Sequence, residues 1–319
     1  MKSGLWTLAC LGCLCGCSNV AVWSSPQKEP APLVTPEATK ANDLFWETFH
    51  GGHYDQIPVA LETLERIYVA HPTDPTITAH IGFLHAWALT ERARLDPVPA
   101  LIVDHAALGR KYFEQAMKLA PDDPRFEGFY GDLLMTEGTL DGDEHEVREG
   151  YYAAKESRDR WFEFNAFTLA FVLSAKPAGD PLFVDSVAAQ FQTLDICYRT
   201  VIDRKNPDIE NYLGLEATET DSRRRRACWN SWIAPHNLEG FFLNWGDMLV
   251  KQGDVATARI VYADAKKVPQ YKTWQFKDVL DKRLAAADAN IEAFRVPGPG
   301  KEPIMFNARF ACMACHLAP

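Results

Sequence analysis

Beyond its first residues the chain lacks any apolar run approaching about 18 residues, the length that a membrane-spanning helix needs. It also lacks an excess of positive charge, because 33 lysines and arginines stand against 43 aspartates and glutamates. A net charge of −10 gives the chain no electrostatic basis for binding nucleic acid. A Gly-rich phosphate loop, a Ser-His-Asp order and paired catalytic carboxylates are missing too. We therefore expect a soluble body that is not an enzyme and has no nucleic-acid partner.

Strand-length alternation of apolar and polar residues is also missing. Across residues 42–294 apolar side chains recur three or four positions apart, which is the helical period. Proline and glycine fall between these runs, as in residues 71–75, 120–124 and 206–208. In each of these breaks an Asp or Thr is placed to cap a following helix. The pattern predicts an all-α domain over residues 42–294.

Residues 242–269 contain small residues at the positions where two paired helices must approach closely. We expect Gly246 to face Ala258 across a narrow contact and Gly253 to form the turn between the two helices. This segment resembles a tetratricopeptide repeat. Weaker copies of the pattern cover residues 81–121 and 42–72. The resemblance implies a degenerate helical-repeat solenoid of antiparallel helix pairs, and the alternative is a non-repetitive helical domain.

Few cysteines lie outside the amino terminus, and two of them form a motif near the end of the chain. Cys312 and Cys315, followed by His316, give the spacing C-x-x-C-H. On a helical turn, thiols three residues apart face the same way and can add to the two vinyl groups on one porphyrin edge. The next imidazole then becomes the proximal iron ligand. The motif resembles that of c-type cytochromes and predicts one covalent haem c. A redox thiol pair, half of a zinc site and a chance match are the alternatives.

Other residues are candidates for contacts with that haem. The distal iron ligand is assigned to Met305 or His236, with Met248 as a further candidate, and Arg309 is placed to pair with a propionate. The remaining histidines do not show a recognisable metal-ligand spacing: His50, His53, His80, His85 and His105.

The amino terminus carries the pattern of an export signal. Met1-Lys2 supplies positive charge, and an apolar run from Leu5 to Leu14 comes next. The run ends in Leu-Cys-Gly-Cys, which resembles the lipobox of bacterial lipoproteins. The resemblance implies a signal peptide over residues 1–16, lipidation of Cys17 and a Pro/Ser-rich tether over residues 17–41. It places the protein in the bacterial cell envelope, facing the periplasm or the surface and anchored in the outer membrane.

Two further features have open interpretations. Cys197 and Cys228 are either a disulfide, which export permits, or two buried thiols. The run from Arg223 to Arg226 is either a docking patch for an acidic partner or a solvated face. In the second case we expect it to pair with Glu216, Glu219 and Asp221.

Together these features predict a membrane-anchored monohaem cytochrome subunit. Residues 295–319 form a Pro/Gly linker and a haem-bearing tail, which is too short to bury a haem and must rest on the helical body or a partner. The expected activity is one-electron transfer, with the repeat surface holding a redox protein or a membrane complex. The alternatives are a non-redox scaffold lipoprotein of an envelope complex and a solute-capturing accessory lipoprotein of a transporter.

Overall fold

The computed structural model describes residues 20, 24–26, 28–231 and 237–318. The expected signal peptide, the lipidation site Cys17 and the candidate ligand His236 lie outside these residues. No helix in the described part of the chain combines the length and the apolar character that crossing a membrane would require.

The described residues form helices and connecting loops, without a strand. The predicted all-α array of antiparallel helix pairs is therefore confirmed. The first helices are α2 (Pro36–His50), α3 (Ile57–Ala70), α4 (Pro75–Thr90), α5 (Asp104–Leu119), α6 (Pro124–Asp141) and α7 (Glu144–Arg160). They continue with α8 (Phe162–Leu173), α9 (Pro181–Tyr198), α10 (Ser222–Ala227), α11 (Leu238–Gln252), α12 (Val255–Ala265), α13 (Lys277–Ala285), α14 (Ala287–Arg295) and α15 (Met313–His316). Short 3-10 turns connect several of them, including η4 (Glu210–Thr218) and η6 (Met305–Asn307).

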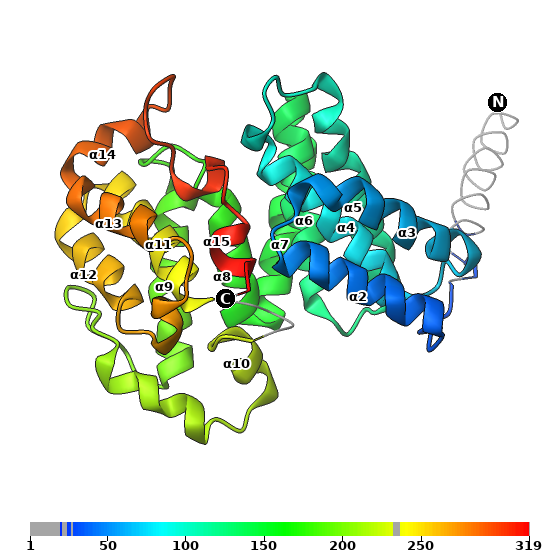
Figure 1. Ribbon diagram of the computed structural model, residues 1–319, viewed down its shortest axis with the longest axis horizontal. Helices are drawn as coiled ribbons and strands as arrows, with labels where there is room; N and C mark the ends of the chain where they lie inside the picture. Colours follow the sequence, from blue (N-terminus) through cyan, green and yellow to red (C-terminus); the bar gives the residue numbers. More distant parts are fainter. Residues whose placement is uncertain (1–19, 21–23, 27, 232–236, 319) are drawn as a thin grey trace, which may run out of the picture.

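The helices gather into two lobes with the carboxy-terminal helix α15 between them (Figure 1). Helices α2 to α7 form one lobe, and α9 together with α11 to α14 forms the other. Helix α8 packs on α6 and α7 as well as on α9, so it connects the two. The largest apolar cluster belongs to the second lobe and includes Ala314 and Cys315, whereas Met313 joins the cluster under α2, α3 and α4. The end of the chain is thus part of both cores.

The predicted breaks between helices are seen at two of the three sites. Asp74 caps α4 by accepting a hydrogen bond from the Ile77 N–H, and Asp123 caps α6 through the Arg125 N–H. At residues 206–208, however, α9 has already ended at Tyr198, and only the 3-10 turn η4 comes next. At this site Pro207 and Asp208 mark the break between helices, but no α-helix begins directly after them.

Glycines in the helix pairs allow the close packing that was expected, with one difference. A Cβ on Gly82 would lie 2.9 Å from the Phe113 ring, so that glycine makes room for the partner helix. Gly253 ends α11 with φ +106°, a conformation that glycine adopts readily. Opposite Gly246 the nearest atoms belong to the Tyr262 ring rather than to Ala258. The contact is narrow because an aromatic ring fills it.

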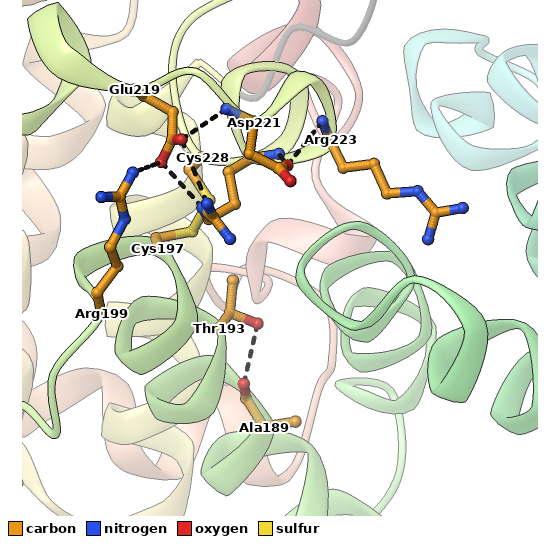
Figure 2. The surroundings of a disulfide bond; sticks show 9 residues. Ala189, Thr193, Cys197, Arg199, Glu219, Asp221, Arg223 and Cys228 are labelled. Carbon is orange, nitrogen blue, oxygen red and sulfur yellow. Dashed lines mark hydrogen bonds and ion pairs between the residues drawn. A yellow bond between two sulfur atoms is a disulfide. The ribbon is translucent and has the colours of Figure 1, made fainter.

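Cys197 and Cys228 form a disulfide that joins the end of α9 to the end of α10. Figure 2 shows the surrounding charges: Glu219 accepts from the Arg199 guanidinium, at 2.6 Å, and from the Asp221 N–H, at 2.8 Å. Arg224 also pairs with Glu219, with Nε 2.9 Å from Oε2. These donors hold the pKa of the Glu219 carboxyl well below its usual range. Part of the arginine run is therefore paired within the fold, as the solvated-face interpretation predicts.

Candidate haem site

The C-x-x-C-H motif is embedded in the protein and does not project from it. Cys312 is the N-cap of α15, Cys315 is buried, and His316 closes the turn with its N–H on the Cys312 carbonyl. The Trp274 indole N–H donates to the Ala314 carbonyl at 3.0 Å, and the Ala318 N–H donates to the His50 carbonyl at 2.9 Å. Both lobes therefore hold the motif in place.

A buried carboxylate at the end of α4 fixes the start of α15. Glu91 Oε1 accepts hydrogen bonds from the backbone N–H groups of Cys312 and Met313, at 2.8 and 2.9 Å. Its other oxygen lies 2.6 Å from Arg94 Nε. Burial raises the pKa of Glu91, against the opposing effect of Arg94 and the two N–H groups. A carboxylate at a helix start satisfies N–H groups that have no partner within the helix.

Glycines on both sides let the tail approach closely. A Cβ on Gly240 of α11 would lie 2.4 Å from the Ala314 carbonyl oxygen and 2.6 Å from Cys315 Sγ. A Cβ on Gly52, whose φ is +67°, would lie 2.7 Å from Leu317. A real Cβ on Gly240 cannot come this close to a backbone oxygen, and the positive φ of Gly52 strains any residue that has a side chain. The groove for the tail is consequently built into two distant segments.

The three residues Cys312, Cys315 and His316 line one cavity of about 460 Å³. Its walls come mainly from α2, α4, α6 and α8, with one residue each from α10 and from the 3-10 turn after α4, and the tail lies on the remaining side. Aromatic rings dominate the lining: Phe45, Trp46, Phe49, Phe83, Trp87, Phe126, Phe129, Phe164, Phe167, Phe171 and Phe306. Cofactor sites are typically cavities of roughly 300–1,000 Å³ with mostly apolar walls. This cavity has the size and the character that a porphyrin needs.

A second cavity of about 400 Å³ borders the same motif and is less suitable. Cys315 and His316 line it together with His50, Glu239 and Trp274, but Cys312 does not. Attachment through two thioethers requires both sulfur atoms on one side of the site. The larger cavity is therefore the one that fits the motif.

Guanidinium groups supply the charge that haem propionates need. Arg92, Arg125 and Arg226 line the larger cavity. Arg125 is paired with Asp123, whereas Arg226 has no ion-pair partner among the described residues. Burial and the neighbouring Arg125 lower the pKa of Arg226 against the opposing effect of Asp123, and a further carboxylate beside it would favour its charged form. The residues present fit a planar apolar ring with two acidic groups.

The same geometry argues against the two other uses of these cysteines. Cys312 and Cys315 are free thiols, and burial raises the pKa of both well above the usual range. Reactive dithiols depend on a lowered thiol pKa, so this environment does not suit thiol–disulfide exchange. Over the described residues, the two thiols also lack a third His, Asp or Glu ligand close enough to complete a metal cluster.

The candidate distal ligands and the propionate partner lie elsewhere in the described structure. Met305 is fully buried in the second lobe, with its N–H on Asp247, and does not line the cavity. Met248 is likewise buried outside it. Arg309 donates to the carbonyl oxygens of Ala93 and Arg94, so its guanidinium ties the tail to the 3-10 turn that follows α4.

Sequence reasoning did not assign two polar residues of the cavity wall to the site. His80 and Asp132 are both buried and line the cavity from α4 and α6. Burial lowers the pKa of His80 to about 3 and raises that of Asp132 to about 8. Each sits in an apolar helical run with the spacing of a core position, and only the tertiary arrangement shows that a cavity lies beside it. A polar residue within a core stripe is the available hint.

Comparison of the chain with protein-family models, with curated proteins and with solved structures found no match in any of the three.

Proposed function

We propose that this protein is a monohaem c-type cytochrome that carries single electrons. The observation that supports the proposal most directly is that Cys312, Cys315 and His316 line one aromatic cavity together with three arginines. An aromatic cavity of this size beside all three residues of the motif supports haem attachment more strongly than the spacing alone does.

In this proposal, the protein residues hold the cofactor and control its surroundings. The two thiols form thioether links, His316 supplies the proximal ligand, and Arg226 with Arg92 neutralises the propionates. When bound, haem supplies an iron that cycles between the ferrous and ferric states. The aromatic walls exclude water, which favours rapid one-electron exchange with little reorganisation. Cys312 and His316 are only partly buried, so the attachment side remains accessible to a redox partner.

Covalent attachment is the first expectation to test. Full-length protein made together with a cytochrome c maturation system is expected to carry one haem that survives denaturation. It should give a pyridine haemochrome spectrum of the thioether type. Cys315→Ala is expected to lower covalent haem severely, because one of the two links is lost. A Cys197→Ala/Cys228→Ala protein serves as the cysteine control and should retain the haem. Colourless wild-type protein whose mass equals that of the bare polypeptide would contradict the proposal and favour the scaffold alternative.

The location of the protein is a separate part of the proposal. Cys17 in its lipobox-like context is proposed to carry the lipid that anchors the protein in the cell envelope. Cys17→Ala is expected to move the protein from the membrane fraction to the soluble fraction, whereas Cys15→Ala should not. Membrane retention of the Cys17→Ala protein, measured by fractionation and immunoblotting, would overturn the assignment.

A further inference from the structure

One histidine of the cavity wall has the surroundings of a metal ligand. His80 lies on α4, is only 6% exposed, and lines the same cavity as His316. The neighbouring histidines do not line this cavity: His50, His85 and His105. His80 is therefore the histidine on α4 that can reach a group bound there.

A hydrogen bond sets which nitrogen of His80 carries the proton. Nδ1 lies 2.8 Å from Oδ1 of Asn42, on α2. An amide oxygen only accepts, so Nδ1 must be the N–H donor and Nε2 must carry the lone pair. The Asn42 contact thus leaves Nε2 as the ring nitrogen that can bind a metal. Histidines that bind metals usually donate their second ring N–H to an oxygen in this way.

Packing holds the imidazole in a single orientation. The His80 ring stacks on Phe45 with a centroid distance of 3.8 Å and an interplanar angle of 6°. The Trp46 ring meets its edge at 5.2 Å and 78°. A ligand whose rotamer is fixed by packing and by a hydrogen bond loses little entropy on binding.

We propose that His80 is the second axial ligand of the haem iron, with Asn42 as its positioning residue. The inference rests on the proposed function, because it assumes that haem occupies the cavity. In this proposal His80, a residue of the cavity wall, takes the place of Met305 and His236 as the candidate distal ligand. The two imidazoles then come from α4 and from the tail, so haem binding ties the end of the chain to the first lobe. An iron ligated on both sides binds no small molecule readily, which suits an electron carrier.

Removal of the ligand is expected to change the spectrum without detaching the haem. Wild-type protein should be low-spin in both oxidation states, and its ferrous form should bind carbon monoxide poorly. His80→Ala should become high-spin and bind carbon monoxide, and added imidazole should restore the low-spin spectrum. His80→Met, which keeps the volume, should give a methionine-ligated spectrum and a raised midpoint potential. His105→Ala is the matched control and should behave like wild type.

Changes at Asn42 test the positioning role with a readout that loss of packing would not reproduce. Asn42→Asp should lower the midpoint potential, because a carboxylate on Nδ1–H makes the imidazole a stronger donor to ferric iron. Asn42→Leu should raise it. Asp43→Asn changes the charge of an exposed neighbour on the same helix and should shift the potential little.

The outcomes separate this inference from the proposed function. Haem-loaded His80→Ala and His80→Met proteins with unchanged low-spin spectra would overturn the ligand assignment and leave the cytochrome proposal intact. Rapid carbon monoxide binding by the ferrous wild-type protein would also overturn the ligand assignment without affecting the cytochrome proposal. Wild-type protein without covalent haem would overturn both.

Discussion

Glu91→Ala is expected to lower the free energy of unfolding by about 2–4 kcal/mol and to reduce covalent haem sharply. The carboxylate is fully buried, and its loss leaves the N–H groups of Cys312 and Met313 and the Arg94 guanidinium without their acceptor. Native domains are stable by only about 5–15 kcal/mol, so this loss is a large fraction of the total free energy of unfolding. Chemical denaturation and the ratio of haem to protein are the measurements.

A series at this position distinguishes the hydrogen bonds from the ion pair. Glu91→Gln keeps an oxygen that can accept from both N–H groups, so the loss should be smaller, about 1–2 kcal/mol, with most haem retained. The control is Glu62→Ala, which removes an ion pair with Arg66. The side chains of Glu62 and Arg66 are each 72% exposed. Exposed pairs contribute little, and no measurable change is expected. Equal behaviour of Glu91→Ala and Glu62→Ala would show that the tail is not held at α4.

The sequence alone predicted the motif of the candidate haem site but not the residues that surround it. The C-x-x-C-H spacing is local, and so are the capping signals at Asp74 and Asp123. The cavity is not local, because Glu91 binds the Cys312 N–H across 221 positions. His80 and the tail line the same cavity although they are far apart in the sequence. In the sequence His80 and Asp132 are indistinguishable from polar residues at ordinary core positions. Sequence spacing identifies metal ligands that lie close together in the chain. It therefore does not identify His80, whose proposed partner His316 lies far away in the sequence.

The helical array could be predicted because three- and four-residue periodicity is a property of each segment. Its details depended on pairs of residues that only the packed structure brings together. The Tyr262 ring, not Ala258, fills the space at Gly246, since a repeat pattern indicates that a contact is narrow without indicating which side chain occupies it. The Pro/Gly-rich segment before the tail suggested a linker, yet residues from Ile304 onward are largely buried against both lobes. A linker composition describes the connection itself and does not predict whether the tail beyond it is buried.

Gly240→Val is expected to displace the tail and to prevent normal haem attachment. Gly240 lies in α11 with ordinary helical backbone, so a larger residue gains helix propensity of up to about 1 kcal/mol. The steric effect outweighs this gain, because the added Cβ meets the Ala314 carbonyl oxygen and Cys315 Sγ. That carbonyl cannot recede freely, since it accepts from Trp274, while Glu91 holds the other side of α15. Overpacking against a fixed backbone costs about 1–3 kcal/mol, so Gly240→Ala should already destabilise and Gly240→Val should do so more.

The control for this prediction is a glycine without close neighbours. A Cβ on Gly214, in η4, would have nothing within 4 Å, so Gly214→Ala should match or slightly exceed wild-type stability. Urea midpoints give the stabilities, and the intensity of the covalent haem band gives the attachment. The order Gly214→Ala, Gly240→Ala, Gly240→Val in falling haem content would show that Cys315 must lie against α11 when the thioether forms. Full haem content in Gly240→Val would show instead that attachment precedes docking of the tail, and the groove on α11 would then serve only the finished protein.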